Sequence, residues 1–205
     1  MGFYAKYVWA PILDLAMRDE ATTAQRRKVV PGARGRVLEV GLGSGLNFPY
    51  YDPASVETIT GLEPCAELQE KARKRAAAAS LSVELVTGSA EDMPFDRATF
   101  DTVLVTWALC SIPDPRAALR EMRRVLKPEG TLLFAEHGLA SDERVARWQH
   151  RLNPVWRTVS GGCNFDRPID GLVREASFTI ERLNTAYLPG PKVLTYNYWG
   201  RAVPA

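Results

Sequence analysis

The hydrophobic and polar positions of this chain change period along its length, and the changes predict most of its secondary structure. Five short apolar runs are typical of strands in a sheet, and they occupy residues 36–40, 58–62, 82–86, 100–106 and 131–135. A helix-forming composition at 65–79 and apolar residues at helical spacing in 115–126 predict helices between them. The alternation predicts a parallel, doubly wound α/β sheet with helices on both of its faces.

The N-terminal stretch departs from this alternation. Residues 11–30 read as one or two helices, because Pro11 suits a first helical turn and apolar residues follow it at helical spacing. Arg26, Arg27 and Lys28 are predicted to form a solvated face of this region, with contact to phosphate or anionic lipid as the alternative.

The C-terminal third also departs from it. The expected elements are a helix at 141–152 with Ser141 as its N-cap, a loop at 153–168, a short helix at 170–175, and strands at 178–183 and 193–201. The last two runs are separated by the turn-forming residues 188–191. They are therefore predicted to form an antiparallel pair at the end of the sheet.

Composition and charge exclude several classes of protein. The chain is 46% hydrophobic and 24% charged, as in an ordinary globular protein, and its formal charge of +2 is too small to indicate a nucleic-acid partner. Its three cysteines lack paired zinc-ligand spacing, and it has only two histidines. We therefore expect no metal site and a reducing compartment.

The distribution of apolar residues bears on location. No apolar run approaches the ~20 residues that cross a bilayer, and no signal peptide is apparent. A cytoplasmic protein is therefore expected. Aromatic residues within 3–9 leave peripheral membrane contact open, although packing against the protein's own core is favoured.

Three closely spaced glycines, Gly41, Gly43 and Gly45, follow the first predicted strand. Glycine lets a backbone turn sharply and approach a ligand closely, so this loop predicts a nucleotide-like ligand. An acidic residue about 20 positions later suits a pair of ribose hydroxyls, and Glu63 stands there. The dinucleotide fingerprint requires a third glycine where this chain has Leu46, which argues against a nicotinamide-dependent oxidoreductase.

The pattern Glu-x-Gly-x-Gly-x-Gly with Glu63 behind it resembles the class I S-adenosylmethionine-dependent methyltransferases of the type 11 group. Three further segments resemble landmarks of that family in the family's order: 88–95, 100–103 and 123–130. The resemblance implies a Rossmann-like three-layer sandwich, with a mostly parallel seven-stranded sheet whose last strand is antiparallel. With 205 residues and no low-complexity linker, the chain is expected to form one domain over 1–205, divided into a helical N-terminal cap (1–35), a cofactor-binding core (36–137) and substrate-side helices with a C-terminal strand pair (138–205).

The resemblance also implies roles for individual residues around S-adenosylmethionine. The three glycines would pass under its methionyl part and ribose, Asn47 would lie near the amino-acid end, and Glu63 would bind the ribose hydroxyls. Pro64, Ala90 and Glu91 would border the adenine, with Ser89 where many relatives have an aspartate. Thr106 and Trp107 would lie beside the sulfonium. Glu39 would either orient the loop or contact the methionyl amine, and both alternatives stay open.

A narrower resemblance concerns the acceptor side. Segments 109–112, 136–137, 153–156 and 161–164 look like those of the methyltransferase-like alkyl-thiol methyltransferases. This implies a small, rather apolar acceptor, with a thiol first and a phospholipid or small amine second. A non-catalytic cofactor-binding protein is the alternative from another class.

Several residues on this side carry two interpretations. His137 is the candidate general base, because imidazole titrates near neutrality, and a hydrogen bond to a loop carbonyl is the alternative. Cys110 and Cys163 are predicted to pack as small apolar groups. Arg167 is a candidate for attracting an acidic substrate, with a surface or salt-bridged arginine as the alternative. Four aromatic residues are candidates for the pocket or the core: Trp148, Trp156, Tyr196 and Trp199.

Overall fold

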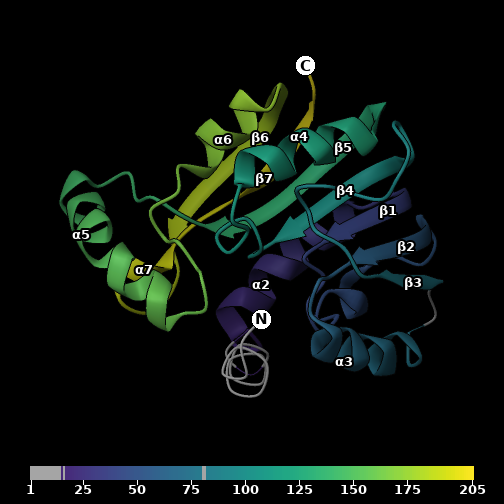
Figure 1. Ribbon diagram of the computed structural model, residues 1–205, viewed down its shortest axis with the longest axis horizontal. Helices are drawn as coiled ribbons and strands as arrows, with labels where there is room; N and C mark the ends of the chain where they lie inside the picture. The colour runs from purple at the N-terminus through teal and green to yellow at the C-terminus, as the bar shows by residue number, and fades with distance from the viewer. Residues whose placement is uncertain (1–14, 16, 80–81) are drawn as a thin grey trace.

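The computed structural model describes residues 15, 17–79 and 82–205. Their backbone forms one seven-stranded sheet in the order β3-β2-β1-β4-β5-β7-β6 (Figure 1). The strands are β1 (Gly35–Val40), β2 (Val56–Leu62), β3 (Val83–Val86), β4 (Phe100–Thr106), β5 (Leu126–His137), β6 (Phe178–Tyr187) and β7 (Tyr196–Pro204). Strands β1 to β5 pair in parallel, and β7 is antiparallel to both β5 and β6. The predicted mostly parallel sheet with an antiparallel last strand is confirmed.

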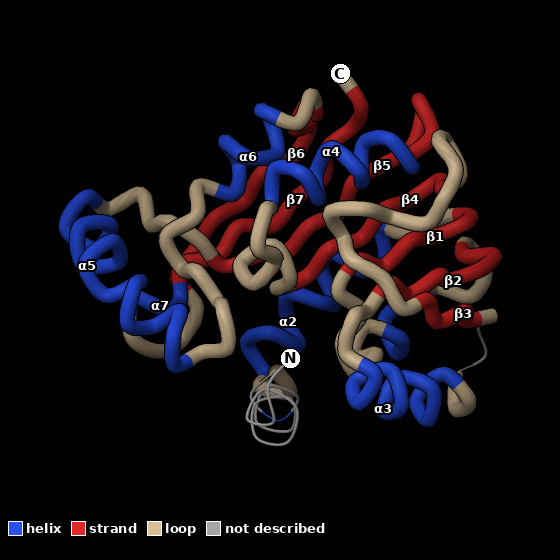
Figure 2. Tube along the Cα trace, viewed as in Figure 1, coloured by secondary structure: helices blue, strands red, loops and turns tan. Residues whose placement is uncertain are grey.

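Helices cover both faces of this sheet. They are α2 (Glu20–Val29), α3 (Ala66–Ala76), α4 (Pro115–Val125), α5 (Glu143–Val159), α6 (Ile169–Glu175) and α7 (Lys192–Thr195), with short 3-10 turns η2 (Val30–Gly32) and η3 (Phe48–Tyr50). In Figure 2, α4 and α6 lie in front of the strands. Figure 1 shows α5 and α3 at opposite ends of the molecule.

The period-2 pattern of the central strands separates two apolar cores. Val103 and Val105 of β4 pack with the buried faces of α4 and α6. Leu104, which points the other way, packs in a second core with Val29 and Ala72 of α2 and α3. Successive strand side chains alternate between faces, so one short apolar run serves both layers.

Helix α5 differs from its prediction at both ends. Its N-cap is Asp142, whose carboxylate accepts from the backbone N–H groups of Arg144 (2.8 Å) and Val145 (3.3 Å). Ser141 instead hydrogen-bonds through its hydroxyl to Tyr196 (3.1 Å), so its assignment as N-cap is wrong. The helix also continues through Pro154 to Val159, where a loop is predicted. Pro154 is exposed, so the carbonyl that it leaves without an N–H partner can be hydrated.

Other differences are smaller. Trp148 is 54% exposed, which excludes it from core and pocket alike. The predicted strand at 193–201 begins later, because α7 occupies its first residues. Among the described helices, none has both the length and the apolar character needed to span a membrane. The aromatic segment 3–9 lies outside the described residues, and the division of 1–205 into one domain of three parts stays a prediction.

Candidate active site

The glycine loop lies where the sheet changes direction. From β1 the chain builds outward through β2 and β3 on one side, and through β4 and β5 on the other. Ligands of open α/β sheets bind at the carboxyl ends of strands at such a switch point. Gly41, Gly43 and Gly45 have φ values of +68°, +59° and +78°. A residue with a Cβ is strained at these angles.

Two of these glycines also allow close packing. A Cβ on Gly41 would lie 2.4 Å from the Cβ of Ala108, and one on Gly45 would lie 2.5 Å from the Phe48 ring. An added Cβ on Gly43 would have no such close neighbour, so glycine is favoured there by the positive φ alone. The loop therefore stays thin at the end of β1, as a cradle for a ligand requires.

Glu63 braces this loop from the end of β2. One carboxylate oxygen accepts from the N–H of Gly43 and the other from the N–H of Cys65, each at 2.9 Å. The side chain is buried, and burial raises the pKa of this carboxyl. A carboxylate has about four lone-pair sites. Each oxygen thus keeps capacity for one further donor, which fits the pair of ribose hydroxyls implied for it.

Glu39 lies beneath the loop, away from the cavity described below. Its oxygens accept from the amide of Asn47 (2.8 Å) and the hydroxyl of Tyr51 (2.7 Å), and the residue is 1% exposed. Burial raises the pKa of its carboxyl to about 7. Of the two roles left open for Glu39, this geometry supports orientation of the loop.

Arg26 is a residue that the sequence interpretation assigned wrongly. It is 4% exposed rather than solvated, while Arg27 and Lys28 are exposed as predicted. Its Nε donates to the Oδ1 of Asn47 (3.1 Å), and its guanidinium lies 4.8 Å from the centre of the Trp107 ring. The spacing along α2 could have indicated that Arg26 is buried, because the buried residues of this helix recur with the helical period: Thr22, Gln25, Arg26 and Val29.

Thr106 and Trp107 end β4 beside the loop. The hydroxyl of Thr106 accepts from the Asn47 amide (2.9 Å). Trp107 has a φ of +48°, which is a strained conformation for a bulky residue. Its indole N–H donates to the Oδ1 of Asn197 (3.1 Å), and Arg26 packs on its ring. Two contacts from distant elements therefore hold this residue in place.

The segment implied to border adenine forms another part of the site. The hydroxyl of Ser89 donates to the carboxylate of Glu91, whose other oxygen accepts from the N–H of Asp114 (3.1 Å). Ser89 is thus turned toward its own loop. Ala90 is 9% exposed and supplies an apolar surface.

One cavity of about 860 Å³ connects most of these residues with the acceptor side. Its lining includes the following predicted site residues: Gly41, Gly43, Glu63, Pro64, Ser89, Ala90, Glu91, Trp107 and His137. Asn47 and Thr106 instead line a smaller adjoining cavity of about 90 Å³. Glu39 and Gly45 line neither cavity. Glu39 contacts the loop through Asn47, and Gly45 contributes a positive φ within the loop.

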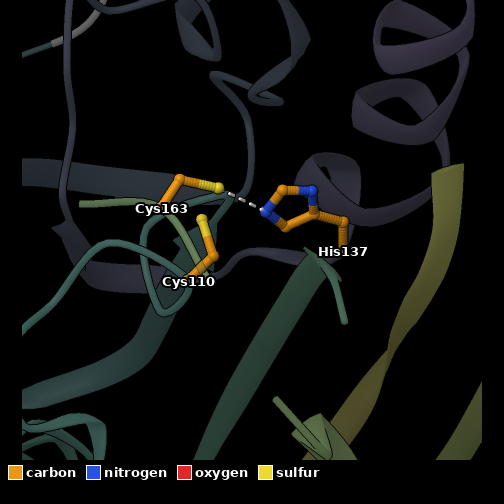
Figure 3. A group of neighbouring side chains, drawn as sticks. All are labelled: Cys110, His137 and Cys163. Atoms are coloured by element: carbon orange, nitrogen blue, oxygen red, sulfur yellow. Dashed lines mark hydrogen bonds between the residues drawn. The ribbon is translucent and has the colours of Figure 1, made fainter. Parts of the chain in front are cut away.

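Three side chains that are far apart in the sequence meet in the wall of the large cavity (Figure 3). The Sγ of Cys163 lies 3.1 Å from the Nε2 of His137, and these atoms and the Sγ of Cys110 all lie within 4.8 Å of one another. The hydrogen bond with Cys110, together with burial, raises the pKa of the Cys163 thiol. His137 also interacts with the backbone of Leu194, which lies in α7 and not in a loop, and its Nε2 faces the thiols.

Two charged residues, Glu136 and Arg167, support the part of the cavity wall that holds Cys110. The sequence alone indicated no role for Glu136 and a different role for Arg167. Glu136 is fully buried, and one of its oxygens accepts from the N–H groups of Ala108 (2.8 Å) and Leu109 (3.0 Å). Burial raises the pKa of this carboxyl to about 7. The Nη1 of Arg167 donates to the carbonyls of Leu109 and Ile112 (2.7 Å to the latter). Arg167 therefore holds the loop after β4, a role that neither of its proposed interpretations includes.

Comparison with known families and proteins agrees with this architecture. Residues 38–134 match the family described as "Methyltransferase domain". Human thiol S-methyltransferase TMT1B is 36% identical over 146 residues, which cover 68% of this chain and 59% of that protein. Human thiol S-methyltransferase TMT1A is 32% identical over 163 residues, with coverage of 78% and 66%. Phosphatidylethanolamine N-methyltransferase of Cereibacter sphaeroides is 32% identical over 133 residues, with coverage of 63% and 64%.

The chain spans about three fifths of the length of the first of these relatives. Among solved structures, a chain in the complex of the Haloferax volcanii Trm112 methyltransferase activator with a methyltransferase aligns with a TM-score of 0.70. It is 22% identical, and 96% of each chain is covered. A Thermotoga maritima S-adenosylmethionine-dependent methyltransferase aligns with a TM-score of 0.64 at 22% identity, covering 98% of this chain and 99% of that one. These structures share the fold.

Proposed function

Because this chain belongs to the S-adenosylmethionine-dependent methyltransferases, we propose that it methylates a small, rather apolar acceptor, with thiols as the first acceptor class. One observation carries the proposal. A single cavity of about 860 Å³ is lined both by the glycine loop with Glu63 and by the group of Cys110, His137 and Cys163. Cofactor and acceptor can therefore share one cavity.

The residues at the cofactor end fit S-adenosylmethionine. Gly41 has no room for a side chain, and both Gly41 and Gly43 have positive φ angles that strain a residue with a Cβ, so glycines at these positions let the loop approach a ligand closely. Glu63 has unused acceptor capacity for ribose hydroxyls. Ala90 and Pro64 offer apolar surface to the adenine ring. When bound, the cofactor supplies an electrophilic methyl group on a sulfonium.

The protein's own tasks are then to position the acceptor and to exclude water. An acceptor thiol with a pKa near ~8.5 is only partly ionised at neutral pH, so a base at its proton assists the reaction. The Nε2 of His137 already lies within hydrogen-bonding distance of one sulfur, that of Cys163. We assign it the role of accepting the proton of an acceptor thiol in the cavity.

Amines are the second acceptor class. The relative from Cereibacter sphaeroides is named for methylation of phosphatidylethanolamine, and the cavity is large enough for more than a small thiol. A radiolabelled methyl-transfer screen of alkyl thiols, amines, phenols and phospholipids compares the classes. Activity confined to amines or lipids would refute the thiol assignment. Cytoplasmic location and peripheral membrane contact stay predictions from the sequence.

Glu63 provides the test of the cofactor site. Glu63→Ala should weaken binding of S-adenosylhomocysteine by about 100-fold or more, because each hydrogen bond to a charged group contributes about 1.5–3 kcal/mol and two are lost. Isothermal titration calorimetry measures this effect. Glu70→Ala is the matched control, since Glu70 is exposed on α3 and pairs with Arg73 and Lys74 of the same helix. Equal affinity of the wild type and Glu63→Ala would show that the cofactor is bound elsewhere.

A further inference from the structure

We propose that Cys110, His137 and Cys163 form a binding site for a thiophilic divalent metal ion, with Zn²⁺ as the first choice. Two thiolates and an imidazole are a preferred ligand set for zinc, and three protein ligands with one open position are typical of catalytic zinc sites. The open position would face the cavity. Binding of the ion does not depend on the proposed function. The role of the open position in binding an acceptor thiol rests on the proposed function.

The distances suit a tetrahedral ion. Zinc–sulfur bonds of about 2.3 Å and zinc–nitrogen bonds of about 2.0 Å place ligand atoms roughly 3.5–3.8 Å apart. Here the Cys163 sulfur and the His137 nitrogen are 3.1 Å apart, and no pair in the group exceeds 4.8 Å. Shifts of about 1 Å or less would bring the three atoms around one ion.

The three side chains come from separate parts of the chain (Figure 3). Cys110 lies in the loop after β4, His137 ends β5, and Cys163 follows α5. Asn164, next to Cys163, donates to the carbonyl of Cys110 from its backbone (2.8 Å) and its side chain (3.0 Å). Its side chain also donates to the carbonyl of Gly162 (2.8 Å). These bonds fix the two cysteine loops relative to each other.

The histidine is oriented as a ligand requires. Its Nε2 faces the sulfurs, while the ring also interacts with the backbone of Leu194. Metal-binding histidines commonly donate their second N–H to a carbonyl, which fixes the tautomer. Glu136 holds the backbone before Cys110 through Ala108 and Leu109. The group therefore has the supporting contacts of a built site.

The open position would take the sulfur of the acceptor. On binding, the ion displaces one proton from each cysteine into solvent, and an acceptor thiol that coordinates releases its own proton in the same way. The acceptor is then held as a thiolate in the cavity. In this state His137 is a ligand and not a base, so its two roles exclude each other.

Cobalt is the probe for the site. The chain is reduced, stripped with a chelator and titrated with Co²⁺, whose thiolate charge-transfer absorption in the near ultraviolet reports coordinated sulfur. We expect one ion per chain, displaced by Zn²⁺. Cys110→Ser and Cys163→Ser should each reduce the charge-transfer intensity by about half and weaken affinity about 100-fold. Cys65→Ser is the matched control, because this buried cysteine is not part of the group and its thiol contacts Glu67.

Each outcome separates the metal site from the proposed function. Absence of the charge-transfer band, or a band of undiminished intensity in both Cys110→Ser and Cys163→Ser, overturns the site even when methyl transfer is observed. Circular dichroism detects whether the cysteine variants fold. If they do not fold, His137→Gln, which keeps both sulfurs, tests whether loss of the third ligand weakens the affinity for Co²⁺. Addition of an alkyl thiol to the cobalt form should raise the intensity by about half. No change refutes the open position, and absence of methyl transfer with the band intact refutes the proposed function only.

Discussion

Glu39 should make the stability of the folded chain depend on pH in a defined direction. Burial raises the pKa of this carboxyl from 4.5 to about 7, although Tyr51 and Asn47 donate to it. The folded state therefore holds a proton that the unfolded chain releases. Stability must then fall as pH rises from about 4.5 to about 7, and the contribution is constant above that window.

The magnitude follows from the two pKa values. A difference of about 2.5 units corresponds to about 3 kcal/mol at 1.36 kcal/mol per unit. Glu39→Gln removes the titration and keeps the contacts, because the new amide oxygen can accept from Asn47 while its NH₂ group donates to the Tyr51 hydroxyl. The variant should match the wild type near pH 4.5 and exceed its stability by about 3 kcal/mol at pH 8, or roughly 6–12 °C in Tm.

Urea unfolding at several pH values, followed by circular dichroism, measures both proteins under the same conditions. Other titrating groups are common to the two chains, so the difference between their curves isolates Glu39. Parallel curves from pH 4.5 to 8 would refute a raised pKa at this position. They would also reopen the alternative that Glu39 is an ionised contact for the methionyl amine.

Two further variants test the loop and its support. Gly41→Ala should destabilise the fold by about 2 kcal/mol or more, because a Cβ there meets Ala108 at 2.4 Å and φ is +68°. The control Gly171→Ala in α6 should not destabilise the fold, because the atom nearest to an added Cβ is 3.8 Å away. Equal decreases of Tm in the two variants would contradict this prediction. Arg26→Gln should cost about 2 kcal/mol in urea unfolding through lost contacts with Asn47 and Trp107. Arg27→Gln removes an exposed ion pair with Glu20 and should lower the free energy of unfolding by at most about 0.5 kcal/mol. A larger decrease for Arg27→Gln than for Arg26→Gln would contradict the assignment of Arg26 as the buried, stabilising arginine.

The local order of strands and helices was predictable because it depends on periodicity within each segment. The central runs alternate between two cores, as at Val103 and Leu104, and a period of two is visible in the letters themselves. The glycine loop and Glu63 were predictable for a related reason. They end β1 and β2, which are parallel neighbours, so their side of the sheet follows from the strand order.

Caps and buried charges were less accessible. Ser141 and Asp142 are both good N-cap residues, and the tertiary structure decides between them, because Tyr196 hydrogen-bonds to Ser141 while Asp142 accepts from the first N–H groups of the helix. The burial of Arg26 depends on Trp107 lying where α2 crosses the ends of the strands. Helical spacing shows that position 26 is on a buried stripe, but it does not say what the guanidinium meets.

The sequence by itself determined the order of strands and helices and the position of the glycine loop, because these depend on short segments whose residues specify their own backbone. The class of chemistry followed from the resemblance of that loop and of Glu63 to the S-adenosylmethionine-dependent methyltransferases. Only the tertiary structure brought Cys110, His137 and Cys163 into one wall of the cavity. Spacing along the chain shows no sign of that group, since each residue lies on a different element. Their meeting depends on how β4, β5 and the turn after α5 pack together, and packing between distant elements leaves no period in the sequence.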